Sequence, residues 1–184
     1  MDRFRLSLSD AEKSYLKDLV LLSITSRLTG RGPATPPPPQ TDLPQRELGA
    51  FVTLNREGRL RGCIGNIIGQ GPLYETVWRM ARAAAFEDPR FPPLTQAELD
   101  GLAIEISILG PIEPCPDPEL VEVGRHGLIM RQGARQGLLL PQVPVEWGWD
   151  RKQFLAQTCR KAGLPANAWR DPTTQLYWFE AVFF

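Results

Sequence analysis

The sequence has very little histidine and cysteine. Of its 184 residues one is histidine, His126, and three are cysteine: Cys63, Cys115 and Cys159. The cysteines are widely spaced and odd in number, and they form no Cys-x-x-Cys pair, which favours reduced thiols over a disulfide framework. Transition-metal sites usually need clustered histidine, cysteine or carboxylate ligands. We therefore expect no metal centre, and no cofactor fingerprint is found.

The chain also lacks an excess of charge and a long apolar run. Lys+Arg and Asp+Glu number 21 each, so the formal net charge is zero, whereas general nucleic-acid binders usually carry a basic excess. No stretch approaches the roughly 18 uninterrupted apolar residues of a membrane span. Residues 1–5 contain no apolar signal core. These absences predict a cytoplasmic protein with no membrane segment.

What the chain does have is enough apolar material for a packed core. Hydrophobic residues make up 42%, and residues 1–184 fit a single domain. A capping box formed by Ser9 and Glu12 predicts the start of a helix, which Gly30 ends. The proline-rich segment 33–44 cannot continue that helix. We expect it to be a stiff, extended surface connector within the domain.

Period-two alternation of apolar residues predicts several strands. Residues 50–54 and 59–64 flank a turn and form a hairpin, and residues 102–109 carry a run of β-branched side chains. Shorter strands are predicted at 120–123, 128–131, 138–140 and 176–184, with helices after Pro72 and Asp150. Hairpins join these strands as often as helices do. The sequence therefore predicts an α+β fold, a largely antiparallel β-sheet flanked by helices.

The second arm of the hairpin carries the densest chemistry in the chain. Leu60-Arg61-Gly62-Cys63-Ile64-Gly65 combines a thiol, a fixed positive charge and two glycines in six residues. In a regular strand Arg59, Arg61 and Cys63 share one face, so two guanidinium groups would stabilise a Cys63 thiolate. The alternative is a small packed residue, with Gly62 and Gly65 needed for backbone geometry.

The loop from Gly65 to Gly71, which includes Asn66, leads into a helix at Pro72. Such a loop can form an anion-binding nest at a helix N-terminus. It lacks the Gly-Lys-Ser/Thr ending of a phosphate loop and the spacing of a dinucleotide site. Ordinary turns are the alternative.

Three further residues are candidates for the same site. Asp88 and Arg90 lie in a proline-braced corner and are expected to pair with each other or with Arg61, as structure or as part of a ligand site. His126 is the one imidazole that can serve Cys63 as a base. The alternative is an exposed turn histidine with no role.

The hexapeptide Leu60–Gly65 resembles the hallmark motif of the AMMECR domain family. Similar matches cover nearly the whole chain: Gly49–Leu54, Ala84–Pro93, Glu105–Leu109, Gly137–Val143 and Cys159–Leu164. The resemblance implies a two-lobed α+β fold around an antiparallel sheet. It also implies membership of a prokaryotic three-part system, with a Memo-like protein similar to non-haem dioxygenases and a radical S-adenosylmethionine (SAM) enzyme as companions. It implies no particular reaction, and the hexapeptide is the family's suspected site.

Three functions remain open. The first is a binding or adaptor subunit that acts on a small anion, a peptide or the partner enzymes. Its candidate binding residues are Arg59, Arg61, Gly62, Gly65, Asn66, Asp88, Arg90 and His126. The second is an enzyme that uses Cys63 for group transfer or thiol redox chemistry. The third is RNA binding through Arg59 and Arg61. The lack of an acid–base pair, a metal cluster or a cofactor motif favours the first, and whether the protein is an enzyme stays open.

Overall fold

The structure, a computed structural model, describes residues 6–184 as two compact units. The N-terminal unit consists of Ser7–Leu109 together with Val182–Phe184, and the C-terminal unit consists mainly of Gly110–Ala181. Residues 1–5, in which the sequence predicts no signal segment, lie outside the described residues. None of the helices within residues 6–184 is long and apolar enough to cross a bilayer.

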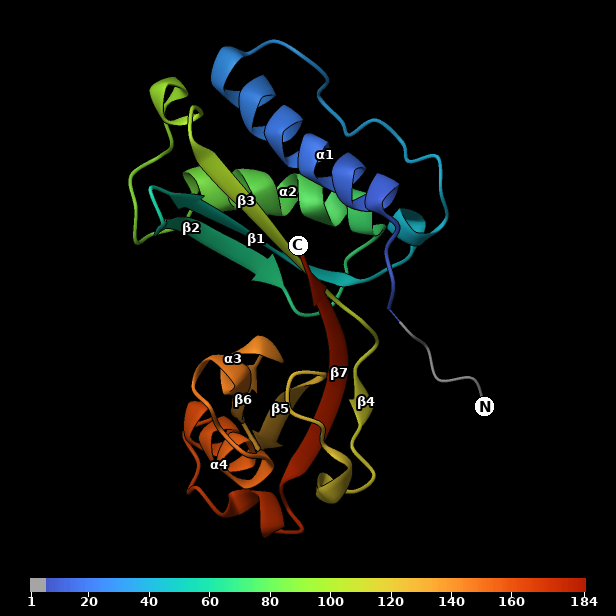
Figure 1. The fold of residues 1–184 in the computed structure, drawn as a ribbon, viewed down its shortest axis with the longest axis vertical. Helices are drawn as coiled ribbons and strands as arrows, with labels where there is room; N and C mark the ends of the chain where they lie inside the picture. Colours follow the sequence, from blue (N-terminus) through green and yellow to red (C-terminus); the bar gives the residue numbers. More distant parts are fainter. Residues whose placement is uncertain (1–5) are drawn as a thin grey trace. The chain divides into compact units, whose positions relative to one another are not determined.

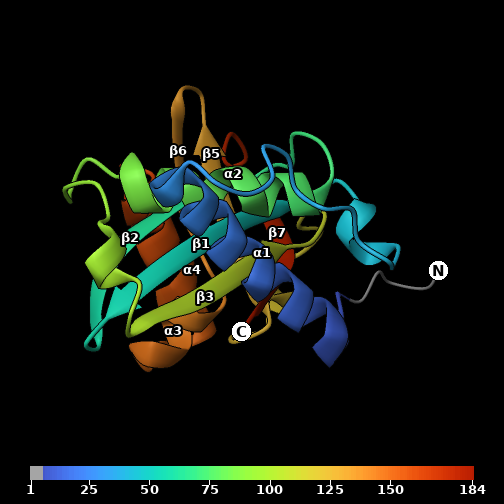
Figure 2. The ribbon, with the colours of Figure 1, turned by 90° about the horizontal axis from the view of Figure 1, so that it is seen from above.

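The N-terminal unit is a three-stranded antiparallel sheet with two helices on one face (Figures 1 and 2). The strands lie in the order β2-β1-β3. The elements are α1 (Asp10–Thr29), β1 (Gly49–Arg56), β2 (Arg59–Asn66), α2 (Leu73–Phe86) and β3 (Leu102–Leu109). The end of the chain joins this unit, because Ile106 N–H donates to the Phe184 carbonyl at 3.0 Å.

The helix-facing side of this sheet forms a dry core. Ala50, Val52 and Leu54 alternate along β1 and are fully buried, as expected for one covered face. Local signals set the first helix: Ser9 and Glu12 form the predicted capping box, and Gly30 ends α1 at φ +64°, a left-handed conformation that suits glycine. These predictions are confirmed.

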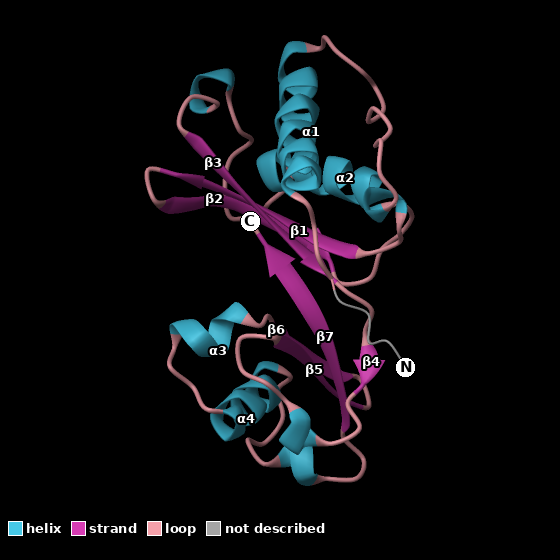
Figure 3. Ribbon diagram, turned by 45° about the vertical axis from the view of Figure 1, so that its right-hand side comes forward, coloured by secondary structure: helices cyan, strands magenta, loops and turns pink. Residues whose placement is uncertain are grey.

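The strands of the C-terminal unit are antiparallel, and β7 pairs with both β5 and β4 (Figure 3). Its elements are β4 (Glu113–Pro114), β5 (His126–Gln132), β6 (Arg135–Leu139), α3 (Gln142–Glu146), α4 (Arg151–Lys161) and β7 (Gln175–Phe183). Helix α4 packs closely on β6, since a Cβ at Gly137 would lie 2.3 Å from the Ala162 nitrogen. The hydrophobic core of the C-terminal unit includes Leu128, Met130 and Phe154.

The α+β prediction is confirmed, and so are the predicted hairpin and the strand at 102–109. The strand predicted at 120–123 is wrong. A 3-10 turn, η3 (Pro118–Leu120), occupies this region, because Pro118 fixes its backbone and the Asp117 side chain accepts the Glu119 N–H at 2.9 Å. Similar short turns lie at η1 (Leu43–Gln45), η2 (Gln96–Glu98) and η4 (Ala168–Arg170).

The proline-rich segment is tied to the start of α1. Tyr15 Oη donates to the Pro37 carbonyl at 2.8 Å, and Thr41 Oγ1 donates to Glu12 at 3.0 Å. Residues 33–42 contain no helix or strand and are mostly exposed, but the extended surface connector predicted at 33–44 is wrong at its end, because Leu43 begins η1 and Pro44 is buried.

Candidate functional site

The hexapeptide lies on β2, the outer strand of the N-terminal sheet. Cys63 pairs with Thr53 of β1, and its backbone groups point away from β1. The Cys63 N–H donates to Asp88 Oδ2 at 2.9 Å, and Arg90 Nη2 donates to the Cys63 carbonyl at 3.2 Å. At this position two side chains therefore take the place of a neighbouring strand, which satisfies an edge that would otherwise be open.

Asp88 and Arg90 form a tight ion pair. Arg90 Nη2 and Nε donate to the two carboxylate oxygens at 2.7 and 2.9 Å. Asp88 is buried, and its side chain is 2% exposed. Hydrogen bonding from Arg90 holds the pKa of the Asp88 carboxyl well below its ordinary value, with help from the Cys63 N–H and against the effect of burial. Of the two pairings that the sequence leaves open, the structure contains Asp88 with Arg90.

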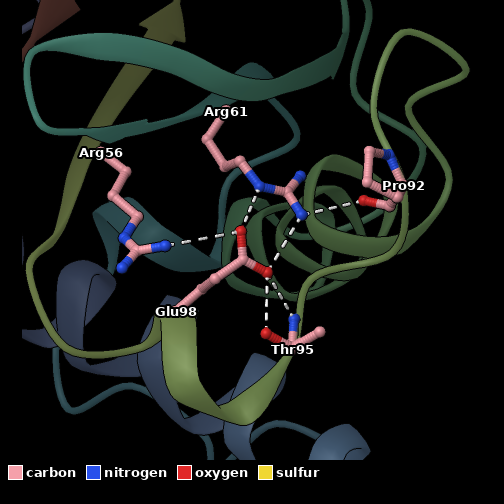
Figure 4. Close-up of polar contacts among 5 residues, drawn as sticks. All are labelled: Arg56, Arg61, Pro92, Thr95 and Glu98. Carbon is pink, nitrogen blue, oxygen red and sulfur yellow. Dashed lines mark hydrogen bonds and ion pairs between the residues drawn. The ribbon is translucent and has the colours of Figure 1, made fainter.

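Arg61 is held by a second carboxylate (Figure 4). Its Nε donates to Glu98 Oε1 at 2.7 Å, and its Nη2 donates to Glu98 Oε2 at 3.3 Å and to the Pro92 carbonyl at 2.9 Å. Glu98 also accepts the N–H and the hydroxyl of Thr95, both at 2.9 Å, and its carboxylate lies between Arg61 and Arg56. Hydrogen bonding from Arg61, and then from the Thr95 backbone, lowers the pKa of Glu98 to about 2.

A β-bulge at Arg61 changes which side chains accompany Cys63. Leu54 pairs with Gly62 and Asn55 pairs with Leu60, so Arg61 is the extra residue. Because directly paired residues share a face, the bulge places Leu60 on the Cys63 face and moves Arg59 to the other. The prediction that Arg59 lies beside Cys63 is therefore wrong.

The thiol has a different set of neighbours from those predicted. Cys63 is half-buried and free, and its Sγ lies 3.2 Å from Thr53 Oγ1. Arg90 is the guanidinium that contacts this residue. The pKa of Arg90 is raised, first by its hydrogen bond to Asp88 and in smaller part by the charge of Cys63. The Phe91 ring centroid lies 5.5 Å from the guanidinium carbon of Arg90.

Three residues of this site were not predicted: Thr53, Phe91 and Glu98. The pairing of the two hairpin arms was a signal for Thr53, because it sets the residue opposite Cys63. Thr95 and Glu98 form a capping box that the sequence predicts, but no local signal places Phe91 or Glu98 at this site, because they reach it through the path of residues 88–98 along β2.

The two glycines of the hexapeptide are needed for packing. A Cβ at Gly62 would lie 2.1 Å from the Ala84 carbonyl oxygen of α2, and a Cβ at Gly65 would lie 2.3 Å from the Phe51 ring. Both contacts are far shorter than side chains tolerate. Close packing therefore accounts for both glycines, and neither has the positive φ that a backbone-geometry role would require.

Side chains of α2 contact the loop that follows β2, where an anion-binding nest was considered. Asn66 ends β2 opposite Ala50, and Arg79 Nη2 donates to the Gln70 carbonyl at 2.8 Å. Glu75 lies in the first turn of α2, and its Oε2 would be 3.7 Å from a Cβ at Gly71. A carboxylate already faces this helix end, which disfavours an anion nest there.

His126 belongs to the C-terminal unit, where it begins β5 and is 4% exposed. Its Nδ1 accepts the Glu122 N–H at 3.0 Å, and its ring lies against Trp178 with centroids 4.4 Å apart. The expectation of an exposed turn histidine is wrong, because a tryptophan distant in sequence covers the ring. Within residues 6–184, no group of three or more His, Cys, Asp or Glu side chains is placed to hold a metal ion.

Comparison with known proteins agrees with the resemblance of the hexapeptide. A family model described as AMMECR1 matches residues 18–184. The chain belongs to the AMMECR1 family. A family relative from Thermococcus gammatolerans is 50% identical over 159 residues, which are 80% of this chain and 78% of that protein. One from Methanothermobacter thermautotrophicus is 42% identical over 183 residues, covering 96% and 95%.

An AMMECR1-family crystal structure shares this fold. It is that of the uncharacterised protein PH0010 from Pyrococcus horikoshii, with a TM-score of 0.84 and 41% sequence identity. The match covers 96% of this chain and 92% of that one. This chain therefore shares its fold with PH0010.

The packing at Gly62 predicts a loss of stability on substitution. Gly62→Ala forces a methyl group against the α2 backbone, and overpacking of this kind costs about 1–3 kcal/mol. Urea denaturation measures the change in the free energy of unfolding. Arg59→Ala, on an exposed residue of the same strand, is the matched control and should change it by less than about 0.5 kcal/mol. Equal effects of the two substitutions would contradict the proposed packing.

Glu98 predicts a pH-dependent contribution to stability. Its pKa is about 2 in the folded chain against an ordinary value of 4.5, so its ion pairs stabilise the fold above pH 4.5. This contribution is lost as the pH falls through the folded pKa. Glu98→Gln should be less stable than the native chain at neutral pH, and the difference should shrink between about pH 5 and pH 2. A difference that stays constant in urea titrations across this range would refute this role.

Proposed function

We propose that this AMMECR1-family protein is a cytoplasmic, non-catalytic binding subunit that acts with a Memo-like protein and a radical SAM enzyme through the corner around Leu60–Gly65. The observation that carries the proposal is that most polar groups of this corner have intrachain partners, although Arg61 Nη1 is buried without a hydrogen-bond partner. Arg61 is engaged by Glu98 and Pro92, and the backbone of Cys63 is engaged by Asp88 and Arg90.

A corner of this kind suits binding better than chemistry. Hydrogen bonds from the guanidinium groups lower the pKa of both carboxyls, so neither is a proton donor at neutral pH and both are weak bases. His126, the only imidazole in the sequence, belongs to the C-terminal unit, and its Nδ1 accepts a backbone N–H. Within the described part of the N-terminal unit, residues 7–109 and 182–184, no histidine accompanies Cys63.

The Asp88–Arg90 and Arg61–Glu98 ion pairs also fix the side chains on the outer surface of this corner. The Arg90 side chain is 54% exposed, although its Nη2 and Nε are bonded to Asp88. Phe91, next to it, is partly exposed and lies against the guanidinium groups of both Arg90 and Arg61. Pre-organised aromatic and arginine side chains are the usual anchors of protein interfaces.

The proposal predicts that Phe91 is an anchor of the complex. The companion proteins from the same organism are mixed with this protein, and the dissociation constant is measured by calorimetry. Phe91→Ala should weaken binding by about tenfold or more, as for other interface anchors. Cys63→Ser should leave binding nearly unchanged, because its backbone contacts are kept.

Trp147→Ala is the matched aromatic control, because Trp147 is 70% exposed and belongs to the C-terminal unit. Failure of the native chain to bind either companion would refute the proposal. So would loss of binding in Trp147→Ala but not in Phe91→Ala.

A Cys63-dependent enzyme is the second candidate, and one observation favours it. The Cys63 Sγ lies 3.2 Å from the Thr53 hydroxyl oxygen, and the Arg90 guanidinium donates to the Cys63 carbonyl. A cationic neighbour promotes thiolate formation. This candidate requires fast alkylation of Cys63 by iodoacetamide at neutral pH, slowed in Arg90→Gln. The binding proposal predicts slow alkylation at neutral pH in both proteins.

The RNA-binding alternative has less support. Arg61 gives its Nε and Nη2 to Glu98 and Pro92, so little of it is left for phosphate groups. Arg59 alone provides no basic patch.

A further inference from the structure

The C-terminal unit contains an open hollow at its α4–β7 connection. The hollow has a volume of about 470 Å³ and is lined by Gln132, Pro165, Asn167, Ala168, Arg170, Asp171 and Pro172. Small-molecule sites usually measure roughly 300–1,000 Å³, so this one has room for a small metabolite. None of its residues belongs to the corner around the hexapeptide.

The lining is fixed by contacts within the unit. Ala168 belongs to the hydrophobic core. Asp171 Oδ1 accepts the Thr173 N–H at 2.8 Å and the Thr173 hydroxyl at 2.7 Å. Gln132 Nε2 donates to the hydroxyl oxygens of Thr173 and Thr174 at 3.0 and 3.1 Å. A site whose residues are already held in place loses little entropy when a ligand binds.

Two of the residues that line the hollow, Arg170 and Asp171, are exposed neighbours in the chain with opposite charges. The Arg170 guanidinium carbon lies 4.6 Å from the centroid of the Trp169 ring, and no ion pair joins it to a carboxylate within residues 6–184. Hydrogen bonds from Thr173 lower the pKa of Asp171, so this carboxylate is ionised at neutral pH. The Thr173 contacts use only its Oδ1, which leaves Oδ2 available.

The geometry points to a binding site for a free α-amino acid. Arg170 binds its carboxylate, because a guanidinium group offers paired donors to carboxylate oxygens. Asp171 accepts its ammonium group. Gln132 and Asn167 also line the hollow, and Pro165 and Pro172 provide apolar walls for the ligand's side chain.

A zwitterion fits this pair of charges better than a simple ion does. Because Arg170 and Asp171 are neighbours in the chain, a lone anion paired with Arg170 would be repelled by the Asp171 carboxylate. A lone cation paired with Asp171 would be repelled by the Arg170 guanidinium. Like charges at short range are destabilising. A ligand that carries both signs neutralises both side chains.

The test uses L-leucine and two analogues that each lack one charge. Calorimetry measures binding of L-leucine, 4-methylpentanoate and 3-methylbutylamine to the full chain. L-Leucine should bind, and each analogue should bind roughly tenfold more weakly or worse, since each lacks one charge-assisted contact. Glycine, L-glutamine and L-phenylalanine extend the test to other side chains. Amide chemical shifts in nuclear magnetic resonance (NMR) spectra should change within residues 165–172.

Two substitutions separate the two charges. Arg170→Gln and Asp171→Asn should each weaken amino-acid binding by roughly tenfold, and an asparagine at 171 keeps the oxygen that Thr173 needs. Arg160→Gln, on an exposed arginine of α4 that does not line the hollow, should bind like the native chain. Thermal unfolding confirms that each variant is folded.

Several results would overturn the proposal. They are no binding of any of the four amino acids, equal binding of L-leucine and its analogues, unchanged binding in both Arg170→Gln and Asp171→Asn, and shift changes confined to residues outside the hollow. None of these results bears on the complex with the companion proteins, so the two proposals can fail separately.

Discussion

The open edge of β2 is the constraint on which the candidate site depends. A strand at the edge of a sheet exposes backbone N–H and C=O groups, and these groups need partners when they are partly buried. Asp88 and Arg90 supply both partners for Cys63, and Glu98 ties Arg61 to the same segment. The two ion pairs therefore complete the edge of the sheet, and they hold residues 88–98 along β2.

This constraint changes the meaning of the hexapeptide. Arg61 stands out in the sequence as a charge available for a ligand, yet in the structure it links β2 to Glu98 and Pro92. Gly62 leaves room for the α2 backbone, and Gly65 leaves room for the Phe51 ring. Each of these residues has a packing role. The groups left to face a partner are the exposed parts of Arg90 and Phe91.

The features predicted correctly from the sequence are those with local causes. Capping boxes, left-handed glycines and apolar alternation act within a few residues, and they located α1, the hairpin and β3. The bulge at Arg61 depends on pairing with β1, and the Arg61–Glu98 pair joins residues 37 apart in the chain. His126 is buried by Trp178. Patterns in a single sequence carry no information on such distant contacts. Several residues of the site were therefore predicted, but the contacts between them were not.

Spare bonding capacity is a better guide to chemistry in this protein than residue type. In the N-terminal unit, the carboxylates of Asp88 and Glu98 are matched by arginines, and this matching lowers the pKa of both. In the C-terminal unit, Arg170 is stacked on a tryptophan without a carboxylate partner among residues 6–184, beside an ionised Asp171 whose Oδ2 is unused by Thr173. Charges paired within the chain stabilise the fold, and a ligand must displace an existing contact to use them. Charges left unpaired beside a hollow need no such displacement, which is why a zwitterion is better accommodated there than at the more conspicuous hexapeptide.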